Sequence, residues 1–539
     1  MSRQRLLITS AVAVAAFLSG GWFMQQGARP GESVYQRARL FDDVLSHVAD
    51  FYVDSLGERQ LYRLAIDGML NELRDPYTGF LDARDLRGLN EAATGNYAGI
   101  GAQIEVRSGA IVVIGPLPET PAERAGILAG DRIVEVNGTS TERFTQDDAV
   151  RALRGPEGTQ VTLKVARVGA SDFLNYTLTR ARIHSRSVRS ALMLSDRVGY
   201  VELNPFSQSS ADEVAAAVDS LKGAGMRALV LDLRYNPGGL LDEGIAVADL
   251  FLESGQDIVA TRGRAPRSTR TFADGAPQRY ADLPLVVLVN GYSASASEIV
   301  AGALQDHDRA LLIGTPTFGK GLVQTVFRLG NDAALKLTTA RWYTPNGRSI
   351  QRPSRSGFEP DDLPPDSVPA RDTTQAPTFR TDAGRTVRGG GGIVPDVVMR
   401  PDSADIRAAE RLTLALGRDI TKYQDALAAF AFQARQRFAV TGPLFPVTPP
   451  MRAGLLDLLR QRGVILDEQT LQIAGAFLDR QLGDQVARLA FGHVGQVRRA
   501  AQDDPILAEA VRTAGRARTQ ADLLAFAEQT GQGASAQRP

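Results

Sequence analysis

The stretch LPLVVLVNGYSASASEIV, residues 283–300, joins an apolar run to three alternating serines and a helical pattern. The run LVVLV lacks polar alternation, which is typical of a strand buried on both faces of a sheet. Ser295 followed by Glu298 fits an S-x-x-E capping box, in which each side chain satisfies a free N–H group of the first helical turn. The stretch therefore predicts a buried strand, a sharp corner and a helix.

Segments of similar character flank this stretch. VGYVEL, ALVLDL and ALLIG are strand-like and alternate with helical patterns such as SADEVAAAVDSLKGAG, as expected for an α/β layer architecture. Upstream, the β-rich segments are GIGAQIEV, AIVVIGPL, DRIVEVNG and TQVTLKVARV, and the short helical segments are TPAERAGI and TQDDAVRALRG. Asn137–Gly138 is a tight-turn signal. We expect a β-rich domain followed by an α/β core.

Helical patterns occupy both ends of the chain. Over residues 35–75, apolar side chains recur at three- and four-residue spacing, which places them on one helix face: Leu40, Phe41, Val44, Leu45, Val48 and Phe51. A second apolar stripe, typical of a helix packed on a partner, lies beyond residue 403: Ile473, Phe477, Leu478, Leu482, Val486 and Leu489.

The predicted fold class is α/β and multidomain. We divide the chain into a signal peptide or membrane anchor (1–30), an N-terminal helical region (31–90), a β-rich domain with two short helices (91–183), an α/β core (184–402) and a helical C-terminal domain (403–539). Residues 352–392 are rich in proline, aspartate, threonine and glycine. Such a segment buries too little apolar surface to order itself, so we predict a flexible insertion there.

Composition excludes several classes of function. The 539 residues include 61 basic and 61 acidic side chains, and this balance gives no reason to expect nucleic acid as a partner. The chain has no cysteine, which excludes disulfides, thiolate zinc sites and a cysteine nucleophile. It has four histidines and no HExxH motif, so a zinc hydrolase is not expected. We predict no metal ion and no organic cofactor.

The N-terminus carries an export signal. Arg3 and Arg5 precede an apolar stretch from Leu6 to about Met24, which is a charged n-region followed by an h-region. The length of this stretch is close to the roughly 20 residues that span a bilayer, so both a cleaved signal peptide and an inner-membrane anchor remain open. In either case the arginines favour an N-terminus held inside and a chain exported to the periplasm or cell envelope.

The serine corner has the features that acyl transfer requires. The amide of Ala296 begins the predicted helix, where N–H groups carry partial positive charge and can bind an oxyanion. A second corner, DLRYNPGGLL, also follows an apolar strand and leaves the amides of Gly238 and Gly239 accessible. A serine hydroxyl needs a base, but His307 lies on the same predicted helix, more than three turns away. That leaves lysine.

Lys320 lies between two glycines in TFGKGLVQ. A lysine is a base only when it is neutral, and burial beside apolar groups favours the neutral form. The rival interpretation is a phosphate-binding loop, because Gly314 and Gly319 precede Lys320 with the Walker spacing. That motif then needs serine or threonine, and the next residue is Gly321, so a nucleotide site is not expected.

The stretch from DLRYNPGGLL through SASASE to TFGKGLVQ resembles the core of carboxyl-terminal processing proteases, also called tail-specific proteases. The resemblance implies a crotonase/Clp-like fold with Ser295 as nucleophile and Lys320, 25 residues later, as its base. It further implies that Gln324 holds the lysine amine, and that the amides of Ala296 and of Gly238 or Gly239 form the oxyanion hole. Asp306 matches a supporting position of the family, although we favour a structural role for it.

YAGIGAQIEV through AGILAGDRIVEVNG resembles the PDZ domain that these enzymes carry, and the resemblance assigns residues 91–183 to it. The loop Gly99, Ile100, Gly101 and Ala102 can present bare amides to a terminal carboxylate, and the tail can add as a strand along AQIEV. We therefore expect protein substrates with free, apolar C-termini. The helical region beyond 403 has no motif that we can assign; oligomerisation and docking of a lipoprotein adaptor or substrate both stay open.

The sequence thus predicts a serine endopeptidase that acts on exported proteins through a Ser/Lys pair. Two other classes remain as alternatives. One is a PDZ peptide-binding scaffold without catalysis, which is disfavoured because Ser295, Lys320 and Gln324 are all present. The other is a crotonase-like acyl-transfer enzyme, which fits neither an export segment nor a PDZ domain.

Overall fold

A computed structural model describes residues 34–107, 110–167, 169–330, 332–352, 377–400 and 402–526. The predicted N-terminal export segment lies outside these ranges. The chain forms two compact units, residues 1–80 and 81–539. The described part of the first unit contains α2 (Val34–Phe51) and α3 (Glu58–Asn71). None of the described helices is both long and apolar enough to cross a bilayer.

Helix α2 carries the predicted apolar stripe, but most of its side chains are exposed in this unit. Leu40 is 62% exposed, Val44 54% and Phe51 79%. Gly57 precedes Glu58 as the N-cap residue of α3. The short strand β1 (Gly79–Leu81) follows.

The β-rich domain folds as the sequence predicts. Its antiparallel sheet has the order β3-β4-β5-β7-β8, with β6 paired to β5, and β2 pairs with β9. Asn137 (φ 49°) and Gly138 (φ 78°) form the predicted turn between β5 and β6. The elements are α4 (Ala83–Thr94), β2 (Asn96–Gly99), β3 (Ala102–Arg107), β4 (Ala110–Pro116), α5 (Pro121–Arg124), β5 (Arg132–Val136), β6 (Thr139–Ser140), α6 (Gln146–Leu153), β7 (Gln160–Ala166), β8 (Leu174–Thr179) and β9 (Ala181–His184).

The α/β core is built on a six-stranded sheet of order β10-β11-β12-β15-β16-β21. β10 is antiparallel to β11, and the remaining neighbours are parallel. All five residues of β12 and of β15 are buried, which confirms the expectation of strands covered on both faces. The strands are β10 (Val188–Met193), β11 (Val198–Leu203), β12 (Ala228–Asp232), β15 (Leu285–Val289), β16 (Leu311–Gly314) and β21 (Val397–Val398).

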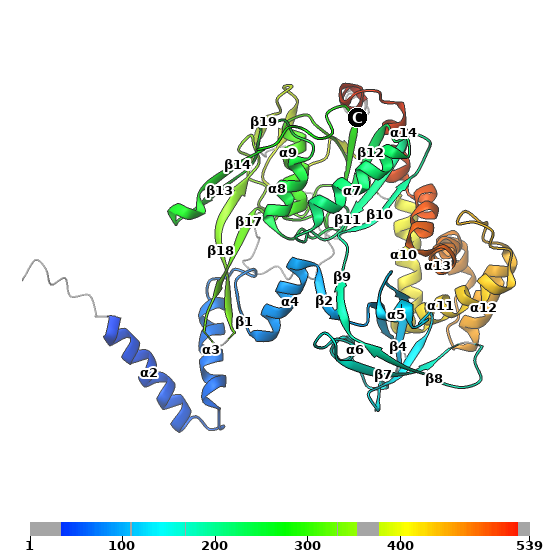
Figure 1. Cartoon of the computed structure of the whole chain (residues 1–539), viewed down its shortest axis with the longest axis horizontal. Helices are drawn as coiled ribbons and strands as arrows, with labels where there is room; N and C mark the ends of the chain where they lie inside the picture. Colours follow the sequence, from blue (N-terminus) through cyan, green and yellow to red (C-terminus); the bar gives the residue numbers. More distant parts are fainter. Residues whose placement is uncertain are drawn as a thin grey trace, which may run out of the picture. The chain divides into compact units, whose positions relative to one another are not determined.

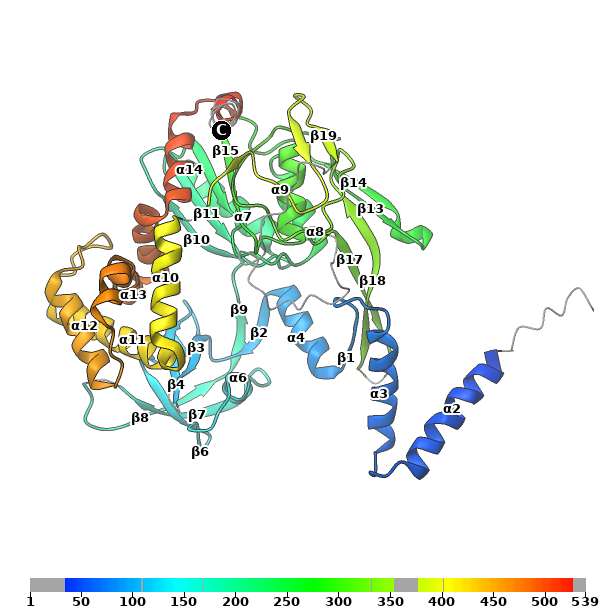
Figure 2. The same cartoon turned by 180° about the vertical axis from the view of Figure 1, so that it is seen from behind.

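Three helices cover one face of this sheet, and a helix from the C-terminal region covers the other. α7 (Ser210–Gly223), α8 (Leu241–Asp249) and α9 (Ala296–Asp306) share one apolar core with the sheet and lie together in Figure 1. On the opposite face, Leu507 and Ala510 of α14 (Pro505–Arg516) pack in a second core with Val230 and Leu288. Figure 2 shows α14 beside β15. The C-terminal region therefore completes the core.

A second, antiparallel sheet includes the two strands that follow the lysine loop, which is the segment 315–321 between β16 and β17. β17 (Leu322–Arg328) pairs with β18 (Ala334–Tyr343), which pairs with β13 (Asp257–Gly263), and β13 pairs with β14 (Arg270–Ala273). The 3₁₀ turn η1 (Pro266–Ser268) connects β13 to β14.

Asp274, directly after β14, shares its surroundings with a second carboxyl group. It is 4% exposed, and burial, followed by a hydrogen bond with Asp249, raises the pKa of Asp274 to about 6. A carboxyl group whose pKa is higher in the folded than in the unfolded chain stabilises the fold fully below the unfolded value. This contribution is lost as pH rises through the folded value.

We therefore expect Asp274→Asn, whose amide mimics the protonated acid, to have little effect on stability at pH 4 and to stabilise the chain by about 1 kcal/mol at pH 7.5. Urea unfolding of both chains at the two pH values measures this difference. A variant that is destabilised equally at both pH values contradicts the prediction.

Part of the predicted flexible insertion is ordered. Residues 353–376 lie outside the described ranges, whereas β19 (Thr378–Arg380) and β20 (Thr386–Arg388) form a hairpin within the predicted insertion. The prediction is wrong here because polar contacts, not apolar burial, hold the segment. Arg385 pairs with Asp308 and Asp396, both at 2.6 Å.

The C-terminal region is helical, as predicted, and most of its helices share a separate apolar core. The apolar stripe of α13 packs there through Leu478, Leu482 and Val486, whereas Ile473 is 45% exposed. Gly492 (φ 70°) bends α13 before it approaches the α/β core. The elements are α10 (Ser403–Leu416), η4 (Gly417–Asp419), α11 (Ile420–Arg437), α12 (Pro449–Gln461) and α13 (Glu468–Asp503).

Candidate active site

The three serines of the opening stretch have different surroundings. Ser293 is fully buried, and its hydroxyl donates to the carbonyl oxygen of Leu233 at 2.8 Å. Ser297 is also fully buried, and its hydroxyl donates to the carbonyl oxygen of Asn236 at 2.9 Å. Ser295 alone of the three is partly exposed. Two serines thus fix the corner, and the middle one faces accessible space.

Ser295 occupies a strained backbone conformation at the start of α9. Its φ of 54° and ψ of −114° lie outside the regions that residues with a side chain favour. Such a conformation costs on the order of 1–3 kcal/mol and persists only where the surroundings enforce it. Here the Ser295 N–H donates to the Glu298 carboxylate at 2.9 Å, and the N–H groups of Glu298 and Ile299 donate to the Ser295 carbonyl oxygen.

Glu298 does more than cap the helix, and this second role could not be predicted from its local motif. Its Oε2 atom accepts from the N–H groups of both Ser295 and Lys320, each at 2.9 Å. The two backbone nitrogens are therefore no farther apart than twice that distance. Its Oε1 atom accepts from the Thr317 hydroxyl at 2.5 Å and the Gly319 N–H at 2.7 Å. One carboxylate joins the serine corner to the lysine loop.

Glu298 is buried, and both of its carboxylate oxygens accept hydrogen bonds from the protein. The side chain is fully buried. Burial raises the pKa of Glu298, and the hydrogen bonds from Thr317, Lys320, Gly319 and Ser295 act in the opposite direction. Four donors converge on its two oxygens, a pattern that an ionised carboxylate satisfies fully, because it only accepts hydrogen bonds.

The lysine loop is fixed by its backbone on every side. The Phe318 N–H donates to the Ser293 carbonyl oxygen at 3.0 Å. The Lys320 carbonyl oxygen accepts from the Trp342 indole at 3.0 Å, and the Gly321 N–H donates to the Gln351 side chain at 2.9 Å. The Cα atom of Lys320 is thereby held beside the serine corner.

Gln324 lies on β17, where a register shift interrupts its pairing with β18. Its side-chain nitrogen donates to the Thr338 hydroxyl at 3.3 Å. The predicted role of Gln324, to hold the lysine amine, stays a prediction.

The NPGG corner, residues 236–239, lies directly against the serine corner, residues 293–297. A Cβ atom on Gly238 (φ 92°) would lie 2.8 Å from the Ser295 Cβ atom and 2.9 Å from the Ala296 nitrogen. The Ala294 N–H donates to the Asn236 carbonyl oxygen at 3.0 Å. The two corners predicted from separate parts of the sequence are therefore adjacent, and only glycine fits where they meet.

Gly238 and Gly239 have different surroundings. The Gly238 N–H donates to the side chain of Asn236 at 2.9 Å. Gly239 (φ 154°) packs against Phe206, whose carbonyl oxygen would lie 2.0 Å from a Cβ atom placed on Gly239. The Gly238 amide is thus engaged within its own turn.

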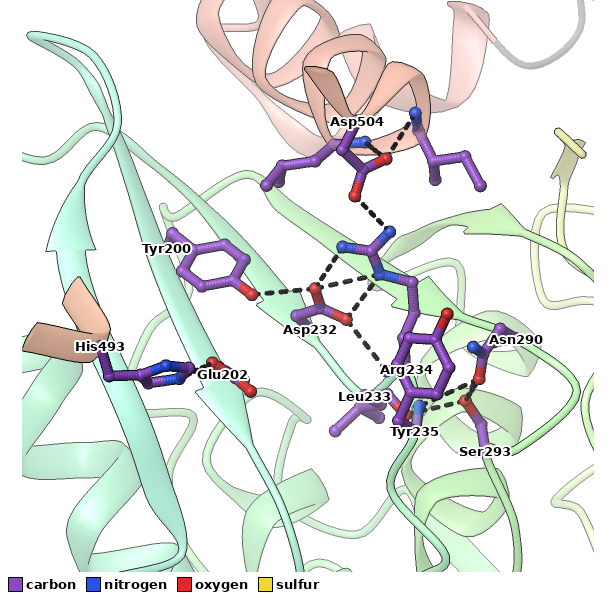
Figure 3. Close-up of polar contacts among 12 residues, drawn as sticks. Tyr200, Glu202, Asp232, Leu233, Arg234, Tyr235, Asn290, Ser293, His493 and Asp504 are labelled. Carbon is purple, nitrogen blue, oxygen red and sulfur yellow. Dashed lines mark hydrogen bonds and ion pairs between the residues drawn. The ribbon is translucent and has the colours of Figure 1, made fainter. Parts of the chain in front are cut away.

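The C-terminal region is bound to the strand that leads into this corner (Figure 3). Arg234, two residues after the end of β12, contacts the Asp232 carboxylate through both Nε and Nη2 and donates from Nη1 to Asp504 at 2.6 Å. Asp504 also caps α14, accepting from the Ile506 N–H at 2.9 Å. Tyr200 donates to Asp232 at 2.9 Å. The NPGG corner therefore starts from an anchored residue.

Two exposed tyrosines border the corners. The rings of Tyr235 and Tyr292 stack with centroids 5.4 Å apart, and Tyr235 has a φ of 59°. The Asn290 side chain accepts from both of their N–H groups, at 3.0 and 3.1 Å, as Figure 3 shows for Tyr235. The pair places an aromatic surface next to the sequence that contains Ser295.

Asp306 lies at the far end of α9 from Ser295, and its charge is paired elsewhere. Asp306 and Arg348 are both fully buried, and their side chains pair at 2.5 Å. The Asn346 N–H also donates to the Asp306 carboxylate at 3.1 Å. These contacts are those of a structural carboxylate.

The loop predicted to bind a carboxylate connects β2 with β3. The carbonyl oxygens of Ile100 and Gly101 accept from the N–H groups of Ala122 and Leu117, both at 2.9 Å. A Cβ atom on Gly101 (φ 76°) would lie 2.3 Å from the Thr120 side chain. The loop is thus fixed through its carbonyl groups, with Gly99 and Ala102 at its two ends. Its role in binding a tail stays a prediction.

Comparisons with known proteins identify the class. Residues 197–363 match the model of peptidase family S41, and residues 112–167 match that of the PDZ domain. The chain is 40% identical over 324 residues to a carboxy-terminal-processing protease of Bartonella bacilliformis, covering 59% of this chain and 74% of the relative. It is 31% identical to the carboxy-terminal processing protease CtpA of Bacillus subtilis, covering 81% and 91%.

The chain belongs to peptidase family S41, among the carboxy-terminal processing proteases that carry a PDZ domain. It is also similar to a solved structure, the photosystem II D1 C-terminal processing protease, with 30% identity and a TM-score of 0.35. That match covers 67% of this chain and 86% of the other. The predicted family and fold class are confirmed.

Proposed function

We propose that this chain is a serine endopeptidase that cleaves exported proteins from their C-termini, with Ser295 as nucleophile and Lys320 as general base. The observation that carries the proposal is the Glu298 carboxylate, which holds the backbone of both residues with one oxygen. Of the three serines, Ser295 alone is partly exposed, as a nucleophile must be. The lysine takes the proton of the attacking hydroxyl and returns it to the leaving amine.

The developing oxyanion is assigned to two backbone amides. Ala296 supplies the first, at the start of α9, where the helix end favours negative charge. The adjacent NPGG corner supplies the second. Because the Gly238 N–H already donates to Asn236, we assign this role to Gly239.

Substrate capture is assigned to the PDZ domain. A free C-terminal carboxylate binds the amides of the loop from Gly99 to Ala102, and the tail adds along β3 as a further strand. The preceding residues of the substrate then extend to Ser295. We propose that the last residue of the tail is apolar, as the family resemblance implies.

The proposed cellular setting is based on the N-terminal sequence. We propose export to the periplasm or cell envelope, because Arg3 and Arg5 precede an apolar segment. Fractionation of cells that express a tagged chain tests this. For the C-terminal helical region, oligomerisation and docking of a lipoprotein adaptor or substrate stay open, and co-purification from membranes would distinguish them.

Single substitutions test the catalytic assignment. We expect Ser295→Ala and Lys320→Ala each to lower kcat on a reporter with a free apolar C-terminus by at least about a thousandfold. Ser254→Ala and Lys336→Ala are matched controls with the same residue types, and both should cleave at the wild-type rate. Circular dichroism establishes that the inactive variants are folded. Cleavage by Ser295→Ala at the wild-type rate would refute the proposal.

A further inference from the structure

The peptide-binding edge of the PDZ domain is the free side of β3. β3 is the first strand of its sheet and pairs with β4. Because successive residues of a strand direct their N–H and C=O groups to opposite sides, Ile104 and Val106 share one side and Glu105 the other. A strand added beside β3 forms its ladder with the backbone groups of Ile104 and Val106.

Two of these backbone groups are already bound, by one side chain. The Val106 N–H donates to Oε1 of Gln146 at 2.9 Å, and Nε2 of Gln146 donates to the Ile104 carbonyl oxygen at 3.2 Å. Gln146 is 40 residues from Val106 in sequence, so this is a tertiary contact. Its carboxamide supplies one acceptor and one donor, as a backbone residue of an added strand does.

The position of Gln146 is fixed by the start of its helix. It is the first residue of α6. The N-cap residue Thr145 and Asp148 bind each other reciprocally, with the Thr145 N–H donating to the Asp148 carboxylate at 2.9 Å and the Asp148 N–H donating to the Thr145 hydroxyl at 3.2 Å. This capping box holds the end of α6 that faces β3.

We propose that the Gln146 carboxamide occupies the edge of β3 in the free chain, and that a substrate tail must displace it in order to bind. This inference rests on the proposed capture of tails by the PDZ domain. A tail that only adds as a strand exchanges its hydrogen bonds for those of Gln146 and gains little. A tail that also places its carboxylate on the loop from Gly99 to Ala102 gains enough to displace it. The side chain thereby lowers the affinity for every added strand by the same factor, so that at a given concentration chiefly tails with a bound carboxylate occupy the site.

The test measures binding by the full chain in a Ser295→Ala background, which prevents cleavage. The probe is a fluorescein-labelled decapeptide with a free apolar C-terminal residue, measured by fluorescence anisotropy beside the same peptide with an amidated C-terminus. Gln146→Ala is expected to bind the free-carboxylate peptide roughly fivefold more tightly, from the net value of the released hydrogen bonds. It should bind the amidated peptide more tightly by the same factor, because either peptide must displace the same side chain. Gln160→Ala, an exposed glutamine on β7, is the matched control and should change neither affinity.

Hydrogen exchange adds a readout that does not depend on the peptide. Mass spectrometry of overlapping fragments should show faster exchange at the Val106 amide in Gln146→Ala, and slower exchange again once peptide is bound. Unchanged exchange at Val106, or an affinity that is equal or weaker in Gln146→Ala, overturns the proposal. Failure of the proposed function has a different signature, namely free and amidated peptides that bind equally to the Ser295→Ala chain.

Discussion

Replacing Glu298 by glutamine is expected to lower kcat by at least about a hundredfold, because displacements near 1 Å of catalytic groups have effects of that size. A glutamine keeps one acceptor oxygen, but its amide nitrogen is a donor. It would face two N–H or O–H groups that now donate to the carboxylate: either those of Ser295 and Lys320, or those of Thr317 and Gly319. In either orientation the amide N–H groups of the glutamine point at buried donors. This repulsion moves the serine corner and the lysine loop apart.

The measurement has two parts. Cleavage of the tailed reporter gives kcat, and urea unfolding gives stability, which should fall by about 1–3 kcal/mol because buried donors lose their acceptor. Glu253→Gln, an exposed glutamate, is the matched control and should be neutral in both. Wild-type kcat in Glu298→Gln would show that the shared carboxylate does not hold the reacting residues in place.

Replacing Arg348 by methionine is expected to destabilise the chain by about 3–5 kcal/mol, since it leaves the Asp306 carboxylate buried without its partner. Both side chains of this pair are fully buried. Arg348 also donates to Gln305 at 3.1 Å and contacts the Arg388 carbonyl oxygen at 3.3 Å, so it joins α9 to the β19–β20 hairpin. Urea unfolding of the variant measures the loss.

A second variant separates the structural from the catalytic role of this pair. Arg348→Met combined with Asp306→Asn removes both charges and should recover part of the lost stability, because no unpaired charge then remains. Asp306→Asn alone should be less stable than wild type, yet cleave within about tenfold of its rate. Complete loss of cleavage in an Asp306→Asn chain of wild-type stability would instead give Asp306 a role in catalysis.

The sequence was sufficient for the architecture because its information was local or came as a long motif. Alternation and apolar runs predicted the strands, and the turn at Asn137–Gly138 formed as expected. The serine and glycine corners were recognised separately, and their adjacency is confirmed by the contact of Gly238 with the backbone at Ser295. The exposed apolar stripe of α2 shows the limit of such patterns. Periodicity predicts which side chains share a helix face, but it does not predict what packs against them.

Long-range partners were not predictable from the sequence. The motif S-x-x-E explains Glu298 within four residues, whereas its other partners lie 19 to 22 residues away across a strand and a loop. Gln146 carries no motif at all, and its role appears only where α6 meets β3. The hairpin at 378–388 seemed too polar to order itself, because buried ion pairs such as Arg385 with Asp396 leave no periodic signal.

The position of α14 has a consequence for biosynthesis. The parallel sheet needs an apolar cover on both faces, and its second cover comes from residues 505–516, more than two hundred residues after β15 in the chain. When a nascent chain has been translated only as far as Lys320, one apolar face of its sheet is therefore still uncovered. Folding of the sheet therefore waits for α14, so the residues around Ser295 acquire this support only after residue 516 has been translated.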